Sequence, residues 1–222
     1  SGKSLSGRAL MGVLPKTARM QADRLSFGGI DLLTASGRTR RSLRGGRMAM
    51  VLQDPKFSLN PIMRVGLQIV EALRIGSSRI TAKQARTQTL AMLESVQIRD
   101  PERVFDLYPH ELSGGMGQRV MIAMMVVREP DLLIADEPTS ALDVTVQGQV
   151  LSIMDELVTR RGMGLILISH DLNLVSRFCD RVLVMYAGRV IERAPAWCST
   201  DRRWARSSTA PSRRGMRRRS RH

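Results

Sequence analysis

Hydrophobic residues along the chain follow two different spacings. Apolar runs with the length of buried strands lie within 47–52, 131–138 and 164–171, and the last two segments have polar residues near their ends. A stretch with helical spacing, 144–161, lies between the last two. Continuous apolar strands separated by helices predict a parallel sheet that is covered on both faces. A later run at 181–192 predicts two strands that turn at Gly188, and the segment before Pro15 predicts a helix.

The interval from Gln53 to Ser113 shows helical spacing and no strand pattern. Apolar residues recur at helical intervals over 65–74 and again after Thr81, where Thr81 and Gln84 form a capping box. The sequence therefore predicts an α/β core with an inserted all-helical subdomain. The predicted divisions are a core at 1–55 and 119–193, a helical subdomain at 56–118, and a tail at 194–222.

Polar residues follow the predicted strands at the point where each strand ends. They are Gln53 after the first run, Asp136 and Glu137 after the second, and His170 after the third. Ligands of parallel α/β sheets bind at the carboxyl ends of the strands, so we expect these side chains to gather at one edge. The opening Ser-Gly-Lys-Ser matches the second half of the phosphate-binding loop G-x-x-x-x-G-K-[ST] and belongs at the same edge.

These residue types suit phosphoryl transfer, which needs charge neutralisation, a metal ion and an oriented water. Lys3 can pair with the phosphates, and Ser4 with Asp136 can hold Mg²⁺. Glu137 can polarise the attacking water, while His170 suits the γ-phosphate and Gln53 the metal or the water. Taken singly, Asp136 and Glu137 fit a solvated strand end and His170 fits a satisfied core histidine. Their combination favours a nucleotide site.

A glycine-rich segment precedes the second strand. In "LSGGMGQRV", residues 112–120, Ser113 opens a predicted helix and two glycines follow. The Ser113 hydroxyl and the N–H groups of Gly114 and Gly115 would present an anion site at the positive end of the helix dipole. The alternative is an ordinary helix cap with flexible glycines.

Taken together, these segments resemble the ATP-binding subunits of ABC transporters from Ser1 to about Arg193. "SGKS" resembles the end of Walker A, "LQDP" the Q-loop, "LSGGM" the signature, "LLIADEP" Walker B, "SALD" the D-loop and "ISHD" the switch histidine. The resemblance implies a P-loop NTPase core with ATP and Mg²⁺ as cofactors. It assigns catalysis to Glu137, His170 and Gln53, metal binding to Ser4, Gln53 and Asp136, and nucleotide binding to Ser1, Gly2, Lys3, Ser4, Ser113, Gly114, Gly115 and Asp143.

Further segments resemble one branch of that family, the importers of dipeptides, oligopeptides and nickel. They include "SLNPIMRVG", "YPHELSGGM" and "VMYAGRVIE". The resemblance implies a peripheral ATPase at the cytoplasmic face of the inner membrane. Its implied partners are a second ATPase subunit, identical or related, two membrane permease subunits and, indirectly, an external substrate-binding protein. In the family each ATP lies between two chains.

Charge and composition add a rival interpretation. The net charge is +15, of which +8 lies in residues 201–222, with nine arginines and one aspartate. Such charge suits nucleic acid, and some ABC-type ATPases act on it. Those relatives carry a long coiled coil or two cassettes, whereas this chain has one cassette with about sixty residues between Q-loop and signature.

No apolar run reaches the roughly 20 residues of a membrane span. Cys179 and Cys198 are expected to be inert thiols in a reducing setting.

Both ends of the sequence depart from the family pattern. The glycine-rich front of Walker A and the first strands of the core are missing, so we expect a truncated N-terminus that weakens ATP binding. The Arg-rich tail has no apolar period and is expected to be disordered. It is either a basic arm for anionic lipid or nucleic acid or the product of a shifted reading frame. An inactive gene fragment therefore remains an alternative to a working ATPase.

Overall fold

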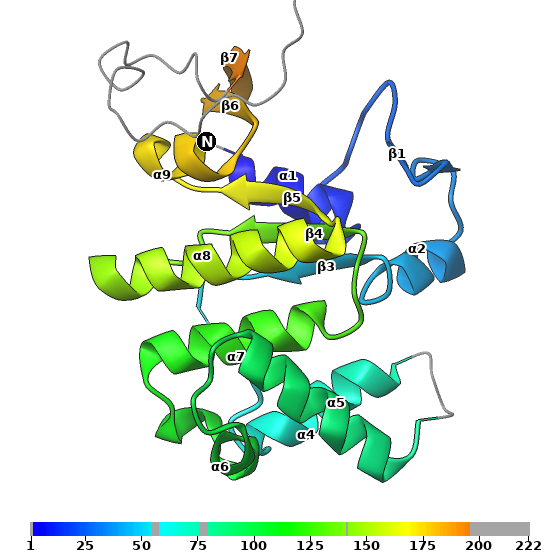
Figure 1. Cartoon of the computed structure of the whole chain (residues 1–222). Coiled ribbons are helices and arrows are strands. Elements are labelled where there is room, and N and C mark those ends of the chain that lie inside the picture. Colours follow the sequence, from blue (N-terminus) through cyan, green and yellow to red (C-terminus); the bar gives the residue numbers. More distant parts are fainter. Residues whose placement is uncertain (1, 55–57, 76–79, 141, 196–222) are drawn as a thin grey trace, which may run out of the picture.

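A parallel three-stranded sheet forms the centre of the molecule (Figure 1). In the computed structural model, residues 2–54, 58–75, 80–140 and 142–195 are described. The sheet has the order β3 (Met48–Val51), β4 (Leu132–Asp136) and β5 (Gly164–Ile168). Val51 pairs with Ala135, and Asp136 pairs with Ile168. The carboxyl ends of all three strands therefore meet at one edge, as the sequence predicts.

β3 and β4 are buried on both faces and β5 is partly buried, which explains the apolar runs. Side chains alternate between the faces along each strand. Met48, Met50 and Ile134 belong to one hydrophobic cluster, together with Met11, Leu32 and Leu43. Ala49, Val51, Leu133 and Ala135 belong to a larger cluster on the opposite face. That second face is covered by α7 (Gly114–Val126) and α8 (Val144–Arg161).

The first helix, α1 (Lys3–Leu10), packs on the other face of the sheet at a glycine. A Cβ atom added to Gly7 would lie 3.2 Å from Ile168 Cδ1 and 3.3 Å from Ile134 Cγ2. The helix can approach this closely because Gly7 has no side chain. It ends before the predicted Pro15, since Gly12 adopts a left-handed conformation (φ 63°) and its N–H donates to the Ala9 carbonyl.

Helices fill the interval between the first and second strands of the sheet. They are α4 (Val65–Arg74), α5 (Ala82–Ser95), α6 (Pro101–Asp106) and the 3₁₀ turn η1 (Pro109–Glu111). Among the described residues from 54 to 113 there is no strand, and the Thr81–Gln84 capping box is confirmed. The boundary suggested at residues 118 and 119 falls inside α7, which packs against α4, α5, β3 and α8. The exact domain division stays a prediction.

Smaller elements flank the sheet. The strands β1 (Ser26–Phe27) and β2 (Ile30–Asp31) form a hairpin that leads to α2 (Gly37–Leu43). The helix α9 (Leu172–Phe178) precedes a second hairpin of β6 (Arg181–Tyr186) and β7 (Arg189–Pro195), which turns at Gly188 as predicted. The first hairpin was not predicted, because two-residue strands are too short to show a period, and α2 was not predicted either.

The expected disorder of the tail concerns residues that lie almost entirely outside the described part of the chain. The tail predicted from residue 194 begins within β7, and residues 196–222 are not described. Where the structure is described, none of the helices combines the length and the apolar character that crossing a bilayer requires.

Candidate functional site

Side chains from three segments meet at the carboxyl edge of the sheet. The Ser4 hydroxyl, in the first turn of α1, donates to Asp136 Oδ1 at 2.8 Å. Asp136 ends β4 and is 5% exposed. Lys3 Nζ donates to the carbonyl oxygen of Ser169 at 2.9 Å, directly after β5. We call this group, together with Glu137 and His170, the nucleotide edge.

Glu137 and His170 face each other across the ends of β4 and β5. His170 Nδ1 lies 3.2 Å from Glu137 Oε1. The Glu137 N–H donates to the Ile168 carbonyl at 2.9 Å, which ties this residue to the end of β5. Glu137 has φ 48°, a left-handed conformation that is uncommon for residues other than glycine. Such conformations concentrate at functional sites, where the surrounding structure compensates for their cost.

Two residues of this edge were missed from the sequence. Ser169 contributes its carbonyl to Lys3, and its hydroxyl accepts from the Asp171 N–H at 3.0 Å. Every residue has a main-chain carbonyl, so the residue type at position 169 could not predict this contact. Gly7 was also missed, although a glycine within a predicted helix was an available signal of close packing.

The signature segment forms the start of α7, and we call Ser113, Gly114 and Gly115 the signature turn. Ser113 caps α7, because its Oγ accepts from the Met116 N–H at 3.3 Å. A Cβ atom on Gly115 would lie 2.6 Å from Val146 Cγ1. The glycine therefore has a packing role in addition to the predicted approach of an anion. The first-turn N–H groups of a helix have no partner within it and remain available for an anion.

Gln53 lies near the signature turn and makes no hydrogen bond to the described residues of the nucleotide edge. It is exposed and lines a hollow of about 500 Å³ together with Ser113 and Gly114. Within the described residues, no hydrogen bond joins Gln53 to Asp136. The predicted role of Gln53 as a metal or water ligand therefore stays a prediction.

The remaining predicted ligands lie at element ends. Asp143 caps α8, since its Oδ1 accepts from the N–H groups of Thr145 at 3.1 Å and Val146 at 3.0 Å. Gly2 precedes α1 with φ 90°, and Ser1 lies outside the described residues. A direct contact of Asp143, Gly2 or Ser1 with nucleotide stays a prediction.

The donor set of the nucleotide edge fits a phosphate-bound Mg²⁺. A serine hydroxyl and a carboxylate 2.8 Å apart provide hard oxygen ligands. Mg²⁺ uses one or two carboxylates plus substrate phosphates and keeps several waters. It does not need a protein cage, and among the described residues no group of three or more His, Cys, Asp or Glu could form one. The ammonium of Lys3 adds a positive charge for phosphate oxygens nearby.

Comparison with known proteins gives a consistent picture. A family profile described as "ABC transporter" matches residues 1–140. The dipeptide transport ATP-binding protein DppD of Haemophilus influenzae is 50% identical over 196 residues, 88% of this chain and 59% of that protein. DppD of Escherichia coli is 48% identical, with 88% and 60% covered. The oligopeptide transport ATP-binding protein OppD of Salmonella typhimurium is 45% identical, with 88% and 58% covered.

The chain thus spans about three fifths of the length of these relatives.

Solved structures share the fold. A dimeric ATP-binding cassette bound to ADP and phosphate has a TM-score of 0.76 and 22% identity, with 88% of this chain and 81% of that chain covered. The protein cbiO1 from Clostridium perfringens, part of an ABC transporter complex, has a TM-score of 0.72 and 27% identity, with 88% and 73% covered.

Proposed function

The chain belongs to the ABC transporter ATP-binding family, and from this premise we propose that it binds and hydrolyses ATP to drive an importer of peptides. The observation that carries the proposal is the nucleotide edge. Ser4 donates to Asp136 at 2.8 Å, and Glu137 lies 3.2 Å from His170, so the nucleotide-binding and catalytic candidates meet at one edge of the sheet.

Each side chain has a role that follows from its position. The Lys3 ammonium donates to the Ser169 carbonyl in this structure. When ATP binds, this ammonium would turn to the phosphates and neutralise part of their charge. Ser4 and Asp136 would hold Mg²⁺, which neutralises phosphate charge when it is bound. Glu137 would orient the attacking water or accept a proton from it. His170 would hold Glu137 in place and reach toward the γ-phosphate.

The signature turn supplies the second half of the site to another subunit. Ser113 is exposed and its helix presents unpaired N–H groups, the arrangement that binds anions at helix N-termini. We therefore place a second ATPase subunit, identical or related, against this turn. Two membrane permeases and an external binding protein complete the proposed importer, with the ATPase at the cytoplasmic face of the inner membrane.

Peptides are the favoured cargo class. The relatives cited above are named for dipeptide or oligopeptide transport, and they match nine tenths of the chain at 45–50% identity. None of those names mentions nickel, so the nickel alternative rests on the branch resemblance alone.

Replacing Glu137 tests the proposed hydrolysis. In Glu137→Gln we expect ATP binding to be retained and the hydrolysis rate to fall by about 10² or more, the usual cost of losing a general base. Calorimetry measures binding and phosphate release measures turnover.

A matched control is available at Glu129. This exposed glutamate also has a left-handed backbone, with φ 54°, and pairs with Arg161 at 3.1 Å. Glu129→Gln should leave hydrolysis unchanged. Turnover that persists in Glu137→Gln, or falls equally in both variants, would rule out the assigned role of Glu137.

A further inference from the structure

The positive charge of the described chain is concentrated in one lobe. Residues 8–47 carry nine Lys or Arg and two Asp, a net charge of +7. The described residues beyond 47 carry fourteen Lys or Arg and seventeen Asp or Glu, a net charge of −3. The segment 8–47, which includes β1, β2 and α2, is called the basic lobe below.

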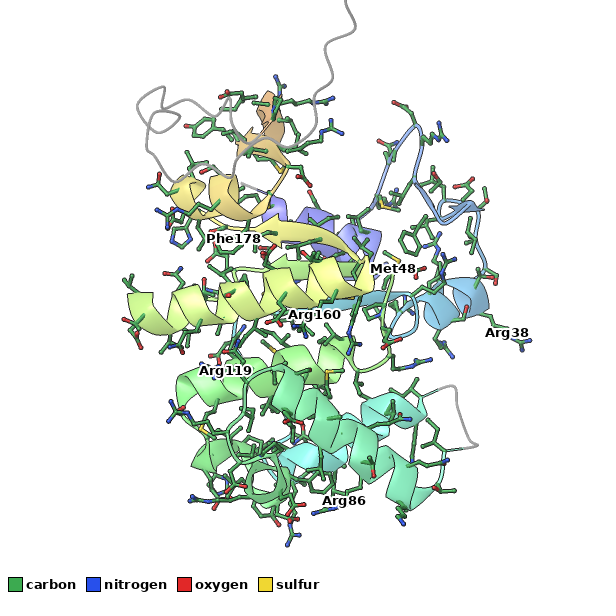
Figure 2. All side chains as sticks on the ribbon, viewed as in Figure 1. Arg38, Met48, Arg86, Arg119, Arg160 and Phe178 are labelled. Carbon is green, nitrogen blue, oxygen red and sulfur yellow. The ribbon has the colours of Figure 1, made fainter. Side chains whose placement is uncertain are left out.

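The basic lobe is a packed part of the fold. Met11, Leu32 and Leu43 share a hydrophobic cluster with Met48 of the sheet. Arg44 donates to the carbonyls of Met11 at 3.1 Å and Gly12 at 3.3 Å, which ties α2 to the end of α1. Met48 lies where the lobe meets the sheet, whereas Arg38 points outward at the periphery (Figure 2). The lobe that carries these charges is therefore held against the sheet.

Most of the cations on this lobe have no internal partner. Among the described residues, no hydrogen bond, ion pair or ring contact engages six exposed side chains, namely Arg8, Lys16, Arg19, Arg24, Arg38 and Arg41. The acids do not balance them. Asp31 accepts from the Leu33 N–H and the Thr34 hydroxyl, and Asp131 pairs with Arg47 at 2.6 Å. Of the two acids within the lobe, only Asp23 has no such partner among the described residues.

We propose that the basic lobe binds an anionic membrane surface. Each Lys or Arg held near anionic lipid contributes a favourable electrostatic term, and six such charges on one lobe add up to measurable binding. Val13, 49% exposed, lies in the same lobe between Arg8 and Lys16. An exposed apolar side chain with cations nearby in the sequence suits the boundary between headgroups and acyl chains.

The lobe is a poorer match to nucleic acid. Single-stranded nucleic acid is bound by aromatic side chains on which the bases stack. The one aromatic residue of the lobe, Phe27, is covered by the Arg47 guanidinium at 5.2 Å from its ring centre. A helix long enough to read a groove is absent from the described lobe, because α2 has seven residues.

Vesicle binding by the whole chain, without nucleotide, tests the proposal independently of ATP hydrolysis. The probe is a vesicle that contains phosphatidylglycerol, compared with one of phosphatidylcholine alone. We expect binding to the first, lost at high salt, and little to the second. Arg38→Glu with Arg41→Glu should weaken binding at least about tenfold, since two attractive charges become repulsive. Val13→Asp should weaken it further.

The matched control separates the lobe from net charge and from the Arg-rich tail. Arg99 and Arg103 are exposed and lie in the helical region, and replacing both by Glu changes the net charge equally. Thermal unfolding verifies that both double variants remain folded. Retained binding in Arg99→Glu with Arg103→Glu supports the lobe. Equal loss in both variants, no binding to anionic vesicles, or tighter lobe-dependent binding of duplex DNA would each overturn the proposal.

Discussion

The nucleotide edge and the signature turn are built in opposite ways. At the nucleotide edge, two side chains of α1 bond to the Asp136 carboxylate of β4 and to the Ser169 carbonyl after β5, across 132 and 166 residues of sequence. At the signature turn, Ser113 bonds within its own helix, and Gly115 packs closely against Val146. The first region is assembled by the sheet within one chain. The second is formed within one helix and is the part that we propose binds the nucleotide of another subunit.

The largest expected effect lies at the nucleotide edge. Asp136→Asn keeps an acceptor for the Ser4 hydroxyl but removes the charge that would hold Mg²⁺, so hydrolysis should fall by about 10² or more. Asp131→Asn is the control, because Asp131 is an exposed partner of Arg47 at the other end of β4. Steady-state phosphate release measures both. If the two variants behave alike, the edge has no special role.

The signature turn gives the next effect. Ser113→Arg places a long side chain over the first turn of α7, and hydrolysis should fall by about 10²-fold, the cost of losing a preorganised anion site. ATP binding by the same chain should persist, because no nucleotide-edge contact involves Ser113. Ser152→Arg, at an exposed position of α8, is the control. Loss of ATP binding in Ser113→Arg would show that one chain uses both regions for one nucleotide.

The close packing of Gly115 against Val146 should affect the free energy of unfolding. Gly115→Ala brings a Cβ atom within 2.6 Å of Val146 Cγ1, and overpacking of this kind costs about 1–3 kcal/mol in the free energy of unfolding. Gly148→Ala is the control, since it has open space in α8 and should gain about 1 kcal/mol from helix propensity. Adding Val146→Ala should rescue Gly115→Ala. Denaturant unfolding measures each, and a stabilised Gly115→Ala would remove the packing role.

The smallest effect lies outside both regions. Thr81→Ala removes one half of the capping box at α5 and should cost about 1 kcal/mol of unfolding free energy. Hydrolysis per folded molecule should stay unchanged. A changed turnover would mean that α5 is coupled to the nucleotide edge more closely than its position indicates.

The sequence predicted those features in which a residue type and its spacing directly reflect the local structure. Asp136 at the end of β4 and His170 two residues after β5 could be predicted because parallel strands that are buried on both faces read as continuous apolar runs. The Thr81 cap could be predicted because its hydroxyl and the Gln84 amide have fixed spacing.

The remaining features depend on contacts that sequence spacing does not encode. The Lys3 contact is with a carbonyl, which every residue carries. The β1–β2 hairpin has two residues in each strand, too few for alternation to be recognised. The packing roles of Gly7 and Gly115 depend on neighbours from distant segments, Ile168 and Val146. The basic lobe was hidden because residues 201–222 carry +8 of the net charge of +15, and only the fold separates paired from unpaired cations.

Mixing two inactive variants tests most directly whether the nucleotide edge of one chain and the signature turn of another form one site. Lys3→Ala disables the edge and Ser113→Arg disables the turn, so each variant alone should be inactive. In an equal mixture, half of the dimers pair one variant with the other and carry one intact site of two, so about a quarter of the original ATP hydrolysis should return. A mixture that remains as inactive as its components, although the two chains associate, would contradict the shared site.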